Sequence, residues 1–220
     1  GDGDDVFRTY DTTAVIGNLD AGAGNDVLDV VVDTGFTVPF GGLAGFESLG
    51  KSGGGTMQVN GPASFDSVQV NGGVLSVSSI GSVTARATTV AAGATLKVGG
   101  AYNGTAGADT FDVAGTVTGS GPVSLGAGDD VLTLHDGASL ATLVDGGAHS
   151  AGDRIVLQAD ADMAFDGTNT TNFESLSKRG AATATLGGTL THTGGTQLVG
   201  GTLVVGGSLL TPTLAVADGT

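Results

Sequence analysis

The sequence predicts an all-β fold, namely a right-handed parallel β-helix of roughly ten coils with about 20 residues each. Three observations lead to this prediction. Glycine is unusually abundant, short Gly-Asp motifs return at a spacing of 21 residues, and a much longer unit occurs twice along the chain. A parallel β-helix explains all three, because each coil is one repeat that contacts only the neighbouring coils.

The composition excludes several other classes of protein. Glycine accounts for 42 of the 220 residues, against a usual share of about 7%, and glycine disfavours helices. A disordered acidic tail would not carry 40% hydrophobic residues. The net charge of −15 argues against nucleic acid as a partner, since phosphate contacts need basic side chains. No apolar run approaches the ~18 residues of a membrane span, so we expect no transmembrane segment.

A long internal repeat divides the chain. The block GFESLGK from Gly45 returns as NFESLSK from Asn172, an offset of 127 residues, and these blocks contain the only two Glu of the sequence. NGGVLSV from Asn71 likewise matches VGGTLVV from Val199. We therefore expect two repeat units within one continuous solenoid, residues 1–100 and residues 101–220.

A shorter period lies inside each unit. GDGDDVF from Gly1 is followed 21 residues later by GAGNDVL from Gly22, and GTAGADTF from Gly104 is followed by GAGDDVL from Gly126. A weaker match, AGDRIVL from Ala151, comes next and has no counterpart in the first unit. The second unit therefore holds one extra coil of about 20 residues, and insertion of a whole coil is typical of solenoids.

Short apolar runs bounded by Gly, Asn, Asp and Ser predict the strands within each coil. Their residues alternate between an inward and an outward face. The clearest runs are Val27–Val31, Val68–Val70, Ala94–Val98, Thr189–Thr191 and Leu203–Val205. An antiparallel β-sandwich would also explain the spacing of the turns, but it does not explain the insertion of a complete coil.

The Gly-Asp turns GAGNDVL and GAGDDVL resemble the calcium-binding nonapeptide of secreted RTX proteins. Glycines turn backbone carbonyls inward, and Asp supplies a carboxylate to an ion held between stacked turns. The candidate calcium ligands are Asp5 with Asp26, and Asp109 with Asp130. The alternative is a stack of Asp turns without metal, which the absence of a nine-residue repetition favours. No cofactor is required by either interpretation, and calcium is the one candidate ion.

Other chemistry-bearing residues point to structure rather than catalysis. A polysaccharide-active β-helix enzyme needs a cluster of carboxylates with a base, whereas the Asp-rich segments here are repeated turns. Lys51 and Lys178 occupy equivalent repeat positions, which indicates a structural role. The three His lack metal-ligand spacing, and His192, within an alternating Thr run, is expected to face solvent. We assign no catalytic residue and expect that the protein is not an enzyme.

The order of these motifs resembles the passenger region of large bacterial autotransporters of the type V secretion pathway. The matching stretches are GTAGADTF from Gly104, GAGDDVLTL from Gly126, NFESLSK from Asn172 and GGTLVVGG from Gly200, and the resemblance covers nearly the whole chain. The chain then corresponds to an internal fragment of a passenger, with the membrane-anchoring barrel expected outside it.

The resemblance implies a β-helix that is extracellular or displayed at the outer membrane of a Gram-negative bacterium. Its implied function is adhesion, autoaggregation or biofilm formation through its faces. The implied partners are host or bacterial surface ligands and other copies of the chain. A calcium-stabilised, RTX-like spacer of a secreted protein is the alternative function.

Overall fold

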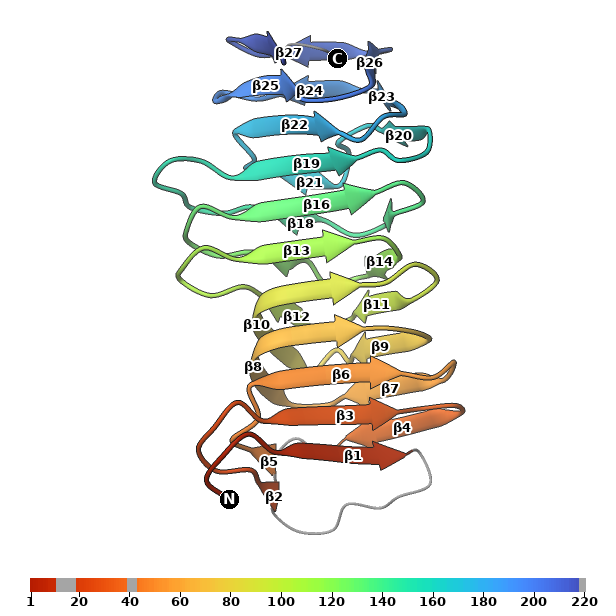
Figure 1. Ribbon diagram of the computed structural model, residues 1–220, viewed down its shortest axis with the longest axis vertical. Coiled ribbons are helices and arrows are strands. Elements are labelled where there is room, and N and C mark those ends of the chain that lie inside the picture. Colours follow the sequence, from red (N-terminus) through yellow and green to blue (C-terminus); the bar gives the residue numbers. More distant parts are fainter. Residues whose placement is uncertain (11–18, 39–42, 218–220) are drawn as a thin grey trace.

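The computed structural model describes residues 1–10, 19–38 and 43–217. It confirms the predicted fold class: strands run parallel to one another in stacked coils, and the described chain contains no helix. The coils rise in one column, with the N-terminus at one end and the C-terminus at the other (Figure 1). The column has three faces, and each coil contributes a strand to most of them.

The first face, called the long face here, carries the longest series of paired strands. Within the described residues this series crosses eleven strands, close to the roughly ten coils expected. In order they are β1 (Val6–Tyr10), β3 (Val27–Val31), β6 (Ser48–Ser52), β8 (Pro62–Val70), β10 (Ser82–Val90), β13 (Thr110–Val113), β16 (Val131–His135), β19 (Arg154–Gln158), β22 (Ser175–Arg179), β25 (Gly195–Leu198) and β28 (Leu214–Val216).

The second face is formed by the strands that follow the long face in each coil. One sheet contains β4 (Gly35–Val38), β7 (Thr56–Val59), β9 (Val74–Val77), β11 (Thr95–Val98), β14 (Thr116–Gly119) and β17 (Ser139–Leu140). A second sheet continues with β20 (Met163–Phe165), β23 (Thr183–Leu186) and β26 (Thr202–Val205).

The third face closes each coil. Its short strands are β2 (Leu19–Asp20), β5 (Leu43–Ala44), β12 (Ala101–Asn103), β15 (Val123–Ser124), β18 (Val144–Asp145), β21 (Thr170–Thr171), β24 (Thr189–Thr191) and β27 (Ser208–Leu210). The N-terminal halves of β8 and β10 also belong here, because Ser82–Thr84 of β10 pairs with β12 whereas Ala87–Val90 pairs with β13. These two strands therefore turn a corner between faces.

The repeats of the sequence match the coils of the structure. Val6 pairs with Val27, and Val27 pairs with Ser48, so the 21-residue spacing is one coil. The structure has strands at all five predicted runs, and the run predicted as Ala94–Val98 begins one residue later, at Thr95. The extra coil is the one that begins with β19, which lies between β16 and β22. The division at residue 100 stays an interpretation, and β10 pairs with β13 across it.

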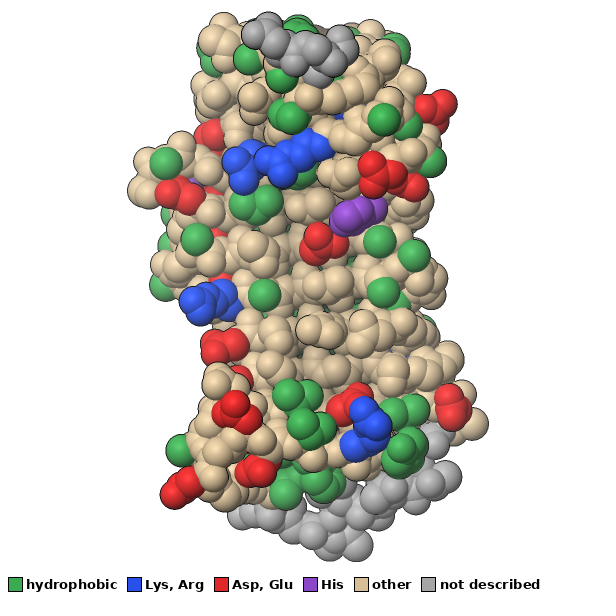
Figure 2. All heavy atoms as spheres, in the orientation of Figure 1, with side chains coloured by type: hydrophobic (Ala, Val, Ile, Leu, Met, Phe, Trp, Pro, Cys, Tyr) green, Lys and Arg blue, Asp and Glu red, His purple; other side chains and the backbone are tan. Residues whose placement is uncertain are grey.

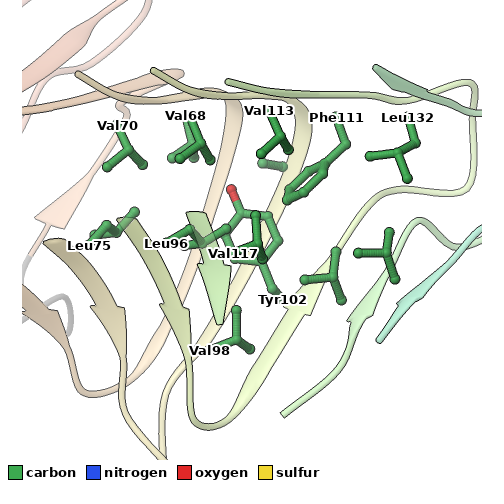
Figure 3. Packing of buried hydrophobic residues seen from close by; sticks show 14 of the residues in the cluster. Val68, Val70, Leu75, Leu96, Val98, Tyr102, Phe111, Val113, Val117 and Leu132 are labelled. Carbon is green, nitrogen blue, oxygen red and sulfur yellow. The ribbon is translucent and has the colours of Figure 1, made fainter. Parts of the chain in front are cut away.

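The core is a stack of inward side chains from alternate strand positions. Along the long face, register places Leu28, Leu49, Val68, Thr88, Phe111, Leu132, Ile155, Leu176 and Thr196 in one column. Figure 3 shows Val68, Phe111 and Leu132 of this column, with Tyr102 lying between the long face and β11. The Tyr102 hydroxyl lies 2.9 Å from Oγ1 of Thr88, so this buried polar pair is satisfied internally.

Candidate functional site

The predicted calcium residues lie at one corner of the column, where the third face passes into the long face. Seven acidic residues each stand directly before a long-face strand, and we call them the carboxylate ladder. They are Asp5, Asp26 and Glu47 in the first repeat, and Asp109, Asp130, Asp153 and Glu174 in the second. Glycine permits the sharp turns: Gly128 has φ +135°, and a Cβ there would lie 2.5 Å from the Gly107 oxygen one coil earlier.

After the first residue of each repeat, each carboxylate of the ladder accepts a hydrogen bond from the ladder amide of the preceding coil. In the first repeat, the Asp5 amide donates to Oδ1 of Asp26 and the Asp26 amide donates to Oε2 of Glu47, both at 2.7 Å. The side chains therefore supply the acceptors that a strand would otherwise provide.

The second repeat repeats this arrangement over one more coil. The amides of Asp109, Asp130 and Asp153 donate to Asp130, Asp153 and Glu174 at 2.8, 2.7 and 2.8 Å. Both ladders thus end in Glu, whose side chain is one methylene longer than that of Asp. The two Asp of each predicted calcium pair lie one coil apart, as expected. They contact each other through a backbone amide and a carboxylate.

The second carboxylate oxygen is satisfied in some coils and unsatisfied in others. In Asp109, Oδ2 accepts from the Thr105 amide at 2.6 Å and lies 3.1 Å from the Thr105 hydroxyl. The side chains of Asp26, Asp130 and Asp153 are fully buried, and their Oδ2 atoms have no hydrogen-bond partner.

Burial raises the pKa of Asp130 to about 6, and it also raises the pKa of Asp153. The amide hydrogen bonds oppose this rise in both residues, and neighbouring acidic groups add to it. Removing a carboxylate from water penalises its charged form, so these sites favour a proton or a cation. Calcium binding by Asp5, Asp26, Asp109 and Asp130 stays a prediction.

One histidine lies beside the ladder, and the sequence pattern does not single it out. His149 Nδ1 lies 3.1 Å from Oε2 of Glu174 and 3.9 Å from Oδ2 of Asp153. Among the described residues, these three form the one group of His, Cys, Asp and Glu whose ligand atoms all lie within 4.8 Å of one another. The only sequence signal is that His149 sits four residues before a ladder Asp, which is too common a spacing to single it out.

The lysines at equivalent repeat positions are both buried. Lys51 Nζ donates to the carbonyls of Gly53, Gly55 and Gly72 at 2.6–2.8 Å. Lys178 Nζ donates in the same way to the carbonyls of Gly180, Ala182 and Gly200. Each ammonium therefore joins the turn of its own coil to the next coil. Burial lowers the pKa of both lysines. The structural role expected from their repeat positions is confirmed.

The expectation for His192 was wrong. Its side chain is only 3% exposed, and its Nδ1 lies 3.2 Å from the Phe173 carbonyl oxygen. The alternation of β24 places Leu190 inward, and His192 follows it as the chain bends towards β25. The even spacing from Leu190, and not the exposed Thr residues beside it, determines the orientation of His192.

A cavity of 310 Å³ opens between β17 and β20. It is lined mainly by apolar and small side chains, including Leu140, Met163 and Phe165, and Asp166 is its one ionisable lining residue. It reaches from the second face to the third, because Thr170 of β21 also lines it, and none of its lining residues belongs to the carboxylate ladder.

Comparison of the chain with protein-family models, curated proteins and solved structures gives no match. Over the residues that the structure describes, no helix has the length and apolar character needed to cross a lipid bilayer.

Proposed function

We propose that this chain is a structural and adhesive β-helix, displayed on a bacterial cell surface or secreted as part of an autotransporter passenger, and that its faces bind surface ligands or other copies of the chain. One observation carries the proposal: the repeated polar residues link neighbouring coils through hydrogen bonds. The ladder carboxylates after the first of each repeat, and the two buried lysines, bond to backbone groups of adjacent coils. The motifs that the sequence repeats thus build length, which is what a stalk requires.

The long face offers a surface for adhesion. The outward positions of β6 and of the C-terminal halves of β8 and β10 carry no charge in a chain of net charge −15. We call this surface the neutral face, and it comprises Ser48, Gly50, Ser52, Ser67, Gln69, Ala87 and Thr89. Figure 2 shows it as the largely uncharged middle of the column. Two acidic rods repel each other least where such faces meet.

Bead clustering tests the proposal. Beads coated with the purified chain are expected to cluster with one another, whereas beads coated with an inert protein stay dispersed. Gln69→Glu adds one charge to the neutral face with almost no change of shape and is expected to reduce clustering. Gln58→Glu makes the same change on the second face and serves as the matched control. Failure of the wild-type chain to cluster or to bind bacterial surfaces would count against an adhesive function.

The buried oxygens without partners favour a second function, a calcium-stabilised spacer. Oδ2 of Asp26 and of Asp130 are the atoms to which an ion would add. Thermal unfolding followed by circular dichroism, in EDTA and in millimolar Ca²⁺, separates the two functions. An unchanged melting temperature is expected for the adhesive stalk, and a large rise that Asp26→Asn and Asp130→Asn abolish would establish the calcium-dependent spacer.

A further inference from the structure

We propose that His149, Asp153 and Glu174 form a binding site for a divalent transition metal of the Zn²⁺ class. These residues belong to neither of the predicted calcium pairs. They lie where the ladder of the second repeat meets the loop that leads into β19. This loop projects from the column (Figure 1).

The loop that carries His149 is longer than its equivalent one coil earlier. Val123 pairs with Val144, and Val131 pairs with Arg154. The stretch from Val144 to Arg154 is therefore two residues longer than the equivalent stretch from Val123 to Val131. His149 lies within this longer stretch, and its Nδ1 lies 3.1 Å from Oε2 of Glu174 in the ladder.

Asp129 fixes the shape of this loop. Its Oδ1 accepts from the amides of Ser150, Ala151 and Gly152 at 3.0, 2.7 and 3.1 Å, and its Oδ2 accepts from the Ser150 hydroxyl at 2.9 Å. These hydrogen bonds hold the pKa of Asp129 well below its usual value. The loop is therefore organised before any ligand binds.

The distances between the three side chains suit a small cation. Tetrahedral Zn²⁺ with bonds of about 2.0–2.1 Å places neighbouring ligand atoms about 3.3–3.4 Å apart. His149 Nδ1 lies 3.1 Å from Glu174 Oε2 and 3.9 Å from Asp153 Oδ2. These two distances lie on either side of the tetrahedral spacing.

Asp153 supplies the independent evidence for a ligand. Its side chain is fully buried, its Oδ1 accepts from the Asp130 amide at 2.7 Å, and its Oδ2 has no hydrogen-bond partner. That unpartnered oxygen faces His149. A buried carboxylate oxygen without a partner is costly, and a bound cation would remove the cost.

The surrounding groups complete the features of a metal site. The Asp130 amide orients Asp153, and the Asp153 amide orients Glu174 at 2.8 Å, as outer-shell donors do in known sites. His149 is 36% exposed, which gives the ion an entry path and leaves room for a water ligand. An imidazole nitrogen selects Zn²⁺, Ni²⁺ or Cu²⁺ over Ca²⁺ and Mg²⁺, which prefer all-oxygen sites.

Isothermal titration of the EDTA-treated, dialysed chain with Zn²⁺ tests the site. One ion is expected per chain, and a tenfold excess of Ca²⁺ is not expected to displace it. His149→Ala and Glu174→Gln are each expected to weaken binding at least 100-fold. Glu174→Gln keeps an oxygen for the Asp153 amide, so this variant preserves the ladder while it removes the charge.

His135→Gln is the matched control. Nε2 of His135 also lies 3.0 Å from a carboxylate oxygen, Oδ1 of Asp112, but among the described residues His135 belongs to no group of three ligand atoms. This variant is expected to bind Zn²⁺ like the wild type, and circular dichroism in EDTA verifies that all variants fold. Wild-type affinity in His149→Ala, or displacement of Zn²⁺ by equimolar Ca²⁺, would overturn the proposal.

Discussion

The backbone amide of Asp109 donates a 2.8 Å hydrogen bond to Oδ1 of Asp130, which lies 21 residues later and one coil further along the column. A side chain thus completes the hydrogen bonding of a backbone group in another coil. The same relationship joins Asp130 to Asp153. It explains why a buried carboxylate is tolerated, since the charge-assisted bond offsets part of the cost of its burial.

Removing the Asp130 carboxylate should destabilise the chain. Asp130→Ala leaves the buried Asp109 amide without an acceptor, so we expect the free energy of unfolding to fall by about 1–3 kcal/mol. Asp130→Asn keeps an acceptor oxygen and removes a buried charge, so its loss should be smaller. Urea unfolding measures both. The exposed Asp66→Ala is the control and should change stability by less than about 0.5 kcal/mol. Equal losses for the Ala and Asn variants would contradict this account.

The buried lysines should matter as much as the ladder. Lys178→Met removes the donor shared by the carbonyls of Gly180, Ala182 and Gly200. We expect a loss of about 3 kcal/mol in the free energy of unfolding, because buried carbonyls lose a charged donor. Lys97→Met, at an exposed position of β11, should be nearly neutral in the same urea titration. An unchanged free energy of unfolding in Lys178→Met would show that water replaces the ammonium at no cost.

The glycines beside the lysines should resist substitution. A Cβ on Gly73 would lie 2.5 Å from Lys51 Nζ and 2.4 Å from the Gly55 oxygen, and its φ is +58°. Gly93 has φ +77° but open space around its Cα. Gly93→Ala therefore measures the backbone strain alone, which is about 1 kcal/mol, and Gly73→Ala should lose clearly more. Thermal melts compare the two variants, and equal melting temperatures would mean that the lysine moves aside freely.

His192 should make stability depend on pH. Burial lowers its pKa below the usual 6.5, although the Phe173 carbonyl and Glu174 oppose this. As pH falls through about 6.5, the unfolded chain binds a proton that the folded chain does not, so stability falls towards lower pH. The urea midpoint of the wild type should therefore drop between about pH 7.5 and 5.5 by more than that of His192→Leu. An identical slope in His192→Leu would refute the assignment.

The fold was accessible from the sequence because the repeats carry it. Each coil needs the same turn and the same alternation, so the 21-residue spacing from Asp5 to Asp26, and again from Asp109 to Asp130, reveals the coil length directly. The equivalence of Lys51 and Lys178 likewise predicted a structural role. These inferences rest on periodicity, which the sequence displays along its whole length.

The details of the site were not accessible in the same way. The direction of the ladder bonds depends on which atoms face each other across coils, and periodicity does not specify this. His149 lies in a loop with no counterpart in the first repeat, so no comparison within the chain could identify it. His192 was placed incorrectly because the exposed Thr residues around it suggested a solvent-facing position.

The two ladders differ in one respect: two Asp precede Glu47, whereas three precede Glu174. Every Asp after the first of its ladder accepts the same bond from the coil before it and donates the same bond to the coil after it. A duplicated stretch of 21 to 23 codons therefore enters the gene without requiring any new partner on either side. Such a protein can change its length by whole coils over evolution, or by engineering, while its chemistry from coil to coil stays constant.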